Sequence, residues 1–141
     1  MAPQETKDLV RRLLEEALTG ARPDATDELV SAGFVGHAPA NPEFRGPEGL
    51  REYASMLRTS FPDLEATVEE VFGEDDRVAA EFTLRGTQRR KYRGVPRTGR
   101  RIELPANAIV RVSDGAVEEL WAEWDQKLLL EQLDVLPKLI K

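Results

Sequence analysis

The side chains able to carry acid–base chemistry are few in this chain of 141 residues. His37 is its single histidine, and a histidine with a pKa near neutrality suits a general base. Asp125 is the second candidate, because its carboxylate ends the stretch LWAEWD and could turn toward a cavity. Each has a structural alternative. A lone histidine often holds a loop carbonyl, and an aspartate directly before QKLLLEQL is a good helix N-cap.

Other side chains could bind a substrate without exchanging protons. Gln88, Tyr53 and Tyr92 can donate hydrogen bonds to a carbonyl or to an incipient enolate. Three further side chains would give a flat aromatic ligand an apolar wall: Met56, Phe82 and Trp124. Each of the three is equally suited to the core, and so is the ring of Tyr53 with its hydroxyl in water.

Composition bounds the protein class. We expect a single domain over residues 1–141, because this length is ordinary for one core. No apolar run is long enough to span a membrane, and the N-terminal residues lack the pattern of a secretory signal. The absence of cysteine fits the cytoplasm, and one histidine excludes a multi-histidine metal site. A net charge of −6 argues against nucleic acid and anionic membranes as partners.

The hydrophobic pattern changes period along the chain. Helical spacing predicts helices at 5–20, 24–32, opened by Asp24 as a cap, 47–60 and 126–134. Alternating residues predict strands at 64–73, 77–88, 100–113 and 115–125, with a further extended segment at 34–38. Helices followed by an antiparallel meander predict one α+β domain, with the N-terminal helices packed in the concave face of a curved sheet.

Strand alternation also assigns the faces of the sheet. The apolar set of each strand should face the helices, which places Ala106, Ala108 and Ala122 on one inner wall. Such small residues either leave room for a ligand or let a helix approach closely. The opposite face should carry Trp121, Val117 and Ile109 among charged residues, so we expect a homodimer through the outer sheet face. The alternative for Trp121 is a ring lying flat on the surface beside arginine side chains.

One segment is strongly basic. Residues 89–101, RRKYRGVPRTGRR, carry seven basic side chains around one tyrosine. Basic residues interleaved with an aromatic can grip a nucleic acid strand, but the remainder of the chain is acidic. A solvated loop is the simpler interpretation. An anionic ligand and the acidic face of a partner remain as alternatives.

The chain resembles the SnoaL-like polyketide cyclase, or ester cyclase, branch of the nuclear transport factor 2-like fold. The resemblance spans nearly the whole chain and is carried by these stretches: FVGHAPANPEFRGPEGLREY, SFPDLEATVEEVFGEDDRVAAEFTLRGTQ, GVPRTGRRIELP, RVSDGAVEELW and WDQKLLLEQL. It implies a cone-shaped α+β barrel without a cofactor. It also implies a ligand of polyketide type, closed into a ring by an intramolecular aldol step in bacterial secondary metabolism.

The sequence departs from the family pattern at the expected catalytic positions. Family cyclases generally place an aspartate after the tryptophan of the final strand, where this chain has Ala122. The histidine that partners this aspartate would fall near Ala108, and the family's Gly-Thr-His reads Gly86-Thr87-Gln88 here. The resemblance therefore implies that the usual acid–base pair is missing.

Two hypotheses from different classes follow. The first is a cofactor-independent cyclase or isomerase acting by acid–base chemistry in an apolar pocket, through His37, Tyr53, Gln88 or Asp125 rather than the usual pair. The second is a non-catalytic protein of the same fold that binds a small hydrophobic molecule. An epoxide-opening cyclase or hydrolase ranks below both. The limonene type of hydrolase needs Asp-Arg-Asp inside the cavity, whereas Arg85 and Arg111 have outward parity.

Overall fold

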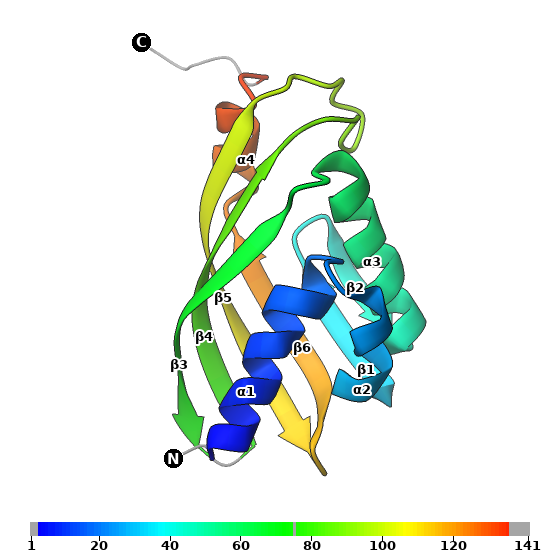
Figure 1. The fold of residues 1–141 in the computed structure, drawn as a ribbon, viewed down its shortest axis with the longest axis vertical. Coiled ribbons are helices and arrows are strands. Elements are labelled where there is room, and N and C mark those ends of the chain that lie inside the picture. Colours follow the sequence, from blue (N-terminus) through cyan, green and yellow to red (C-terminus); the bar gives the residue numbers. More distant parts are fainter. Residues whose placement is uncertain (1–2, 75, 136–141) are drawn as a thin grey trace.

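The computed structural model describes residues 3–74 and 76–135, which form an α+β fold (Figure 1). Its helical elements are α1 (Gln4–Arg12), the π-helical η1 (Leu13–Leu18), the 3-10 turn η2 (Pro23–Ala25), α2 (Thr26–Leu29), α3 (Gly46–Ser60) and α4 (Gln126–Gln132). Its strands are β1 (Val30–Ala38), β2 (Asn41–Arg45), β3 (Glu65–Glu74), β4 (Arg77–Thr87), β5 (Arg101–Ser113) and β6 (Ala116–Trp124).

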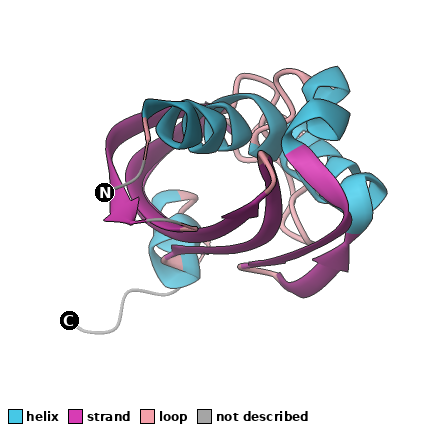
Figure 2. Cartoon of the chain, turned by 90° about the horizontal axis from the view of Figure 1, so that it is seen from below, coloured by secondary structure: helices cyan, strands magenta, loops and turns pink. Residues whose placement is uncertain are grey.

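The strands form one six-stranded sheet in the order β2-β1-β6-β5-β4-β3. All neighbours are antiparallel except β1 and β6, which run parallel. Seen from below, the sheet curves strongly and α1 lies across its concave side (Figure 2). The buried apolar residues of helices and strands form one core cluster between these layers. This architecture confirms the predicted fold class.

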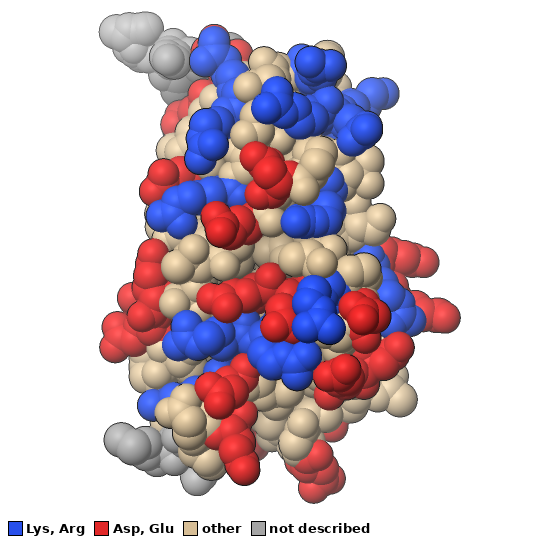
Figure 3. Space-filling model, viewed as in Figure 1, with Lys and Arg blue, Asp and Glu red and all other residues tan. Residues whose placement is uncertain are grey.

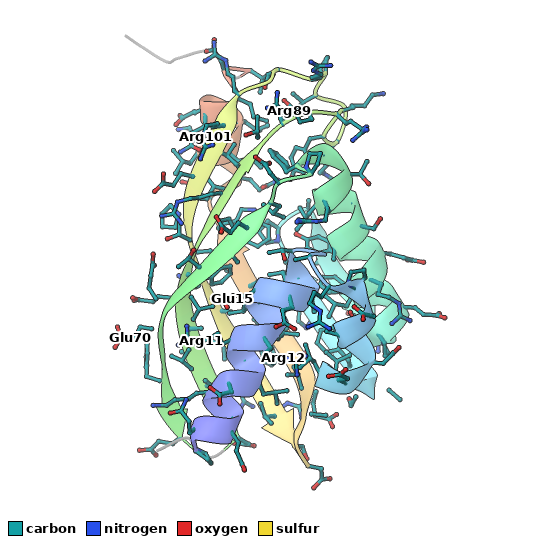
Figure 4. The ribbon with its side chains drawn as sticks, in the orientation of Figure 1. Arg11, Arg12, Glu15, Glu70, Arg89 and Arg101 are labelled. Atoms are coloured by element: carbon teal, nitrogen blue, oxygen red, sulfur yellow. The ribbon has the colours of Figure 1, made fainter. Side chains whose placement is uncertain are left out.

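Hydrogen bonds to one residue of an edge strand hold α1 and η1 in place. Arg11 Nη1 donates to the carbonyl oxygen of Val68 at 2.9 Å, and the Val68 amide donates to Glu15 Oε2 at 3.0 Å. Arg11 and Glu15 both lie beside β3 in Figure 4. Because these side chains satisfy backbone groups that an edge strand would leave unpaired, they also blunt that edge.

The helix predicted over residues 24–32 is wrong in extent. Helical structure, formed by η2 and then α2, ends at Leu29, and the Asp24 side chain does not cap it. Strand β1 begins at Val30 because its residues pair with β6, and β-branched and aromatic side chains favour that conformation. Strand β2 was not predicted. Its Phe44 ring covers Gly36, where any Cβ would overlap the ring.

A β-bulge corrects one assignment to the outer face. Val112 pairs with Val117, whereas Arg111 pairs with Glu119, so Glu118 is an extra residue without a partner on β5. An extra residue reverses the side-chain alternation beyond it. Val117 is therefore fully buried in the core rather than exposed beside Ile109.

Candidate active site

The two alanines at the expected catalytic positions lie side by side on the inner face. Ala108 pairs directly with Ala122, and their exposures are 2% and 1%. Both belong to the core cluster that includes the leucines of η1. Neither lines the apolar chamber described next. Their placement favours the alternative in which alanine lets a helix approach the sheet closely.

An apolar chamber lies at the end of the sheet covered by α4 and the segment 88–100. We call it the apical chamber, and its volume is about 10 Å³, roughly the space needed by one water. It is lined by Leu57, Phe61, Leu64, Leu84, Tyr92, Ile102, Leu104, Trp124 and Leu129. Within the described part of the chain, this lining holds no carboxylate and no imidazole. The chamber is closed in this conformation.

Three polar groups converge at the wall of the chamber. Trp124 Nε1 donates to Gln126 Oε1 at 3.2 Å, and Gln126 Nε2 donates to the Tyr92 hydroxyl at 3.1 Å. The Tyr92 hydroxyl also lies 3.3 Å from Gln126 Oε1, a long contact for its own proton. Tyr92 and Trp124 line the chamber whereas Gln126 does not, and the polar atoms of these three side chains bond to one another.

Tyr92 closes the chamber as well as lining it. Its side chain is buried, and its ring meets Phe61 edge to face with centroids 5.5 Å apart. Burial raises the pKa of the Tyr92 hydroxyl, although Gln126 and the nearby charge of Arg93 oppose that rise. Tyr92 therefore stays protonated at neutral pH and acts as a hydrogen-bond donor rather than as a base.

Gln88 holds the segment that carries Tyr92. Its Nε2 donates to the Val95 carbonyl at 3.1 Å, and its Oε1 accepts from the Thr98 amide and hydroxyl at 3.0 and 2.6 Å. The side chain is fully buried, as its inward parity predicts. These bonds occupy the amide, so Gln88 positions the loop and is not presented to the chamber.

The other predicted binding residues lie in the core or at its margin. The Tyr53 hydroxyl donates to the Pro39 carbonyl at 2.7 Å, and its ring stacks on Phe44 with centroids 4.8 Å apart. Burial raises the pKa of Tyr53, so it too stays protonated. Phe82 is buried on the inner face, and Met56 is partly buried against the core. Of the predicted apolar wall, only Trp124 lines the apical chamber.

The structure places His37 on the outer face of the sheet. His37 pairs with Trp121 of β6, and the two rings stack with centroids 5.6 Å apart. Its Nε2 lies 2.7 Å from Glu119 Oε2 and its Nδ1 lies 2.7 Å from the Pro42 carbonyl. The hydrogen bond to Glu119 is the main cause of a raised pKa for His37, and partial burial of the ring opposes that rise. Two acceptors at its two nitrogens favour a protonated ring that is held in place, away from the apical chamber.

Asp125 caps α4. Its Oδ1 accepts from the Leu128 amide at 3.0 Å, and the residue is exposed. This favours the capping alternative over a turn toward the cavity. The adjacent Gln126, which sequence reasoning overlooked, is bonded instead to two residues that line the chamber, Trp124 and Tyr92. The signal for Gln126 was its place two residues after the strand that ends in Trp124.

Fold and site together define a class: a small curved-sheet domain with an apolar interior chamber and uncharged hydrogen-bond donors at one end. The chain belongs to the SnoaL-like polyketide cyclase family, whose model matches residues 8–133, and this confirms the family predicted from the sequence. Among the described residues, no helix is long and apolar enough to cross a membrane, and no three His, Cys, Asp or Glu side chains are grouped to hold a metal ion.

Individual relatives agree with the family assignment. The chain is 34% identical over 125 residues to aklanonic acid methyl ester cyclase DauD of Streptomyces sp. strain C5, covering 84% of this chain and 74% of that protein. Its fold is similar to the crystal structure of a protein assigned as a SnoaL-like polyketide cyclase from Jannaschia sp. CCS1, with 26% identity, a TM-score of 0.86 and coverage of 97% and 98%. IdmH from Streptomyces antibioticus, also assigned as a polyketide cyclase, has 30% identity, a TM-score of 0.79 and coverage of 94% and 100%.

Proposed function

We propose that this protein is a cofactor-independent cyclase of bacterial polyketide metabolism that closes a ring in the apical chamber. Family membership and relatives named as ester cyclases support an enzyme acting on an aromatic polyketide ester. The observation that carries the site is an apolar chamber lined by Tyr92 and Trp124, whose polar groups are joined through Gln126 directly beside it. The absence of cysteine from the sequence supports the cytoplasm as its compartment.

The proposed reaction is an isomerisation. A C–H flanked by carbonyl groups loses its proton to water, and the resulting enolate carbon attacks a carbonyl carbon of the same molecule. The π electrons of that carbonyl move to its oxygen, which takes up a proton, so no oxidant or reductant is consumed. Tyr92 and Gln126 would donate hydrogen bonds where negative charge develops on oxygen, the kind of stabilisation that dominates many such reactions.

Substrate entry requires the chamber to open. A drug-sized ligand fills about 300 Å³ or more, whereas the chamber measures about 10 Å³. The segment 88–100 is the element to move, because it carries Tyr92. Gln88 bonds within the segment, and Ser60 holds it to α3: its hydroxyl donates to the Lys91 carbonyl at 2.7 Å, and its carbonyl accepts from the Arg89 amide at 2.9 Å. Retraction of the tyrosine ring would join the chamber to solvent.

The test is proton exchange combined with product analysis. The protein is incubated in deuterated water with an anthraquinone-type polyketide methyl ester that carries an acidic C–H, and mass spectrometry follows deuterium uptake and ring closure. We expect enzyme-dependent ring closure that Gln126→Leu strongly reduces and His37→Ala leaves nearly unchanged. A tight complex with no ring closure would instead support the non-catalytic binding protein.

We also propose that the outer face of the sheet pairs two copies of the chain. One cross-strand row of that face is largely apolar or aromatic, and the strand registers align its members from β3 to β1: Phe72, Ala79, Ile109, Trp121 and His37. Phe72 and Ile109 are 48% and 49% exposed, which is high for large apolar side chains.

The rows on either side of this stripe differ in charge. One contains Arg77 and Arg111 together with Glu74 and Glu119 and is mixed in charge, whereas the other contains Glu70, Glu81 and Glu123 and is acidic. A twofold axis through the stripe would set Arg77 of one copy near the acidic row of the other, while Arg111 stays paired with Glu119 of its own chain at 3.2 Å. Such self-complementarity is what a symmetric dimer interface requires, and it supports a second copy as the occupant of this face.

A further inference from the structure

A basic collar surrounds the end of the molecule that holds the apical chamber. It consists of the seven basic residues of the segment 89–101, and the same segment contains none of the 26 acidic residues of the chain. Figure 3 shows blue side chains gathered at that end, with acidic side chains concentrated below it. Arg89 and Arg101 both lie there in Figure 4. Below that end basic and acidic side chains are mixed on this face, so the segment is set apart by carrying positive charge alone (Figure 3).

Ion pairs leave most of this charge uncompensated. Within residues 3–74 and 76–135, only Arg100 of the seven forms an ion pair, with Asp134 at 3.3 Å. All seven side chains are exposed. Structural pairing therefore does not explain why an acidic chain concentrates positive charge on the loop that closes its chamber.

The charge of the collar reaches the hydroxyl groups beneath it. Arg93 directly follows Tyr92, the residue that closes the chamber. Burial raises the pKa values of both Tyr92 and Tyr53, and in each case the charge of Arg93 opposes that rise. An acidic group of a ligand that occupied the position of the Tyr92 ring would be exposed to the same positive charge.

We propose that the basic collar makes the protein bind and turn over its substrate as an anion, an enolate or phenolate formed by ionisation into water. This inference rests on the proposed function and names the substrate class of that same site. Positive charge near an acidic C–H or O–H stabilises its conjugate base, and the collar concentrates anions at the entrance. It thereby supplies what the missing carboxylate–histidine pair would otherwise provide, because no base in the chamber is needed for a substrate that arrives ionised.

The experiment is a spectrophotometric titration of alizarin, a hydroxyanthraquinone whose colour reports its ionisation. Its first pKa is measured free and bound to the full-length protein at low salt, alongside binding of its uncharged dimethyl ether. The variants are Arg93→Gln and the double substitution Arg93→Gln/Arg97→Gln, at exposed side chains with no described hydrogen bond. Lys7→Gln, in α1 at the opposite end of the molecule (Figure 1), is the control with the same change of charge.

We expect binding to lower the pKa of alizarin by about 1 unit, as a nearby opposite charge does. The shift should shrink at high salt, which screens exposed charges, and in both collar variants but not in Lys7→Gln. If alizarin and its ether both bind while the pKa stays unchanged or rises, the inference of an anionic substrate is overturned and the chamber survives. An equal loss of the shift in Lys7→Gln overturns it too. If neither compound binds, the proposed function fails with it.

Discussion

Two clusters of aromatic and polar side chains lie on opposite faces of the same strand, β6. On the inner face, Trp124 is hydrogen-bonded to Gln126, which contacts Tyr92. On the outer face, Trp121 stacks on His37, which is bonded to Glu119. The inner cluster is uncharged, whereas the outer one contains the chain's single histidine and a carboxylate. By residue type alone, the outer cluster resembles a catalytic site more closely.

The surroundings of the two clusters reverse that impression. His37 and Glu119 satisfy each other, and Arg111 Nη2 lies 3.2 Å from the second oxygen of Glu119, so their charges are already compensated. Neither His37 nor Glu119 lines the apical chamber. The inner cluster borders an apolar space where a hydrogen bond is worth more than in water. Position in a low-dielectric site therefore decides between the clusters, and the presence of titratable groups does not.

The largest effect is expected from removing the hydroxyl of the inner cluster. Tyr92→Phe keeps the ring that closes the chamber but removes its O–H donor. We expect ring closure to slow about 100-fold, the lower end of the effect of deleting one oxyanion donor. Single-turnover kinetics on the anthraquinone-type ester would measure it, with the melting temperature as the check on folding.

His37→Ala is the matched variant on the outer face, and its single-turnover rate should stay within about twofold of the wild type, since surface changes away from a site are small. The opposite ranking, with His37→Ala slower than Tyr92→Phe at equal stability, would return the catalytic role to the histidine. The comparison between the faces would then be reversed.

Sequence reasoning located the inner cluster in part. Strand parity correctly predicted that Phe82, Ala108, Ala122 and Trp124 face inward, because alternation is a local property. The face of His37 could not be read in this way. Strand β1 reaches its partner β6 through a parallel pairing across more than 80 residues of sequence, and no local pattern encodes that register.

Features that depend on an inserted residue or on a loop were also hidden. The bulge at Glu118 turned Val117 inward, although its spacing from Trp121 placed both on one face. Gln126 became part of the site only because the segment 88–100 folds back and brings the Tyr92 hydroxyl within 3.1 Å of it. Neither event leaves a periodic signal in the sequence.

The second prediction assigns association to the outer face. Ile109→Lys places an unpaired charge in the apolar stripe, so we expect the dimer dissociation constant to rise at least about tenfold, as for the loss of a contributing interface residue. Sedimentation velocity across a concentration series would measure it. Ser55→Lys introduces the same lysine at an exposed position of α3 and should leave the dimer dissociation constant unchanged. If the wild-type chain remains monomeric at high concentration, the outer face is not a dimer interface.

A third prediction separates two neighbours at the end of β6. Asp125→Ala removes the cap of α4 and should lower the free energy of unfolding by about 1 kcal/mol, measured by urea denaturation. Because the Asp125 carboxylate bonds to the Leu128 amide and not to the inner cluster, the rate of ring closure should change little. Asp125→Asn, which retains a capping side chain, should recover most of the stability. If it recovers the stability but abolishes ring closure, Asp125 acts in the chemistry after all.

The smallest effect concerns how the two clusters respond to pH. The bond to Glu119 raises the pKa of His37 above 6.5, so the protonated ring stabilises the fold below that value, and its contribution is lost as pH rises through the raised pKa. The hydrogen bond to His37 is the main cause of a pKa of Glu119 below 4.5, so the contribution of Glu119 to stability is lost only in stronger acid.

His37→Gln should therefore reduce the free energy of unfolding by about 0.5–1 kcal/mol near pH 6, as for partly exposed ion pairs, and by less at pH 9. Tyr92→Phe should show a constant difference over this range, because the raised pKa keeps the Tyr92 hydroxyl protonated throughout. Urea titrations of both variants at the two pH values would make the measurement, and a constant difference for His37→Gln would mean that the pKa of His37 is the same in the folded and unfolded protein.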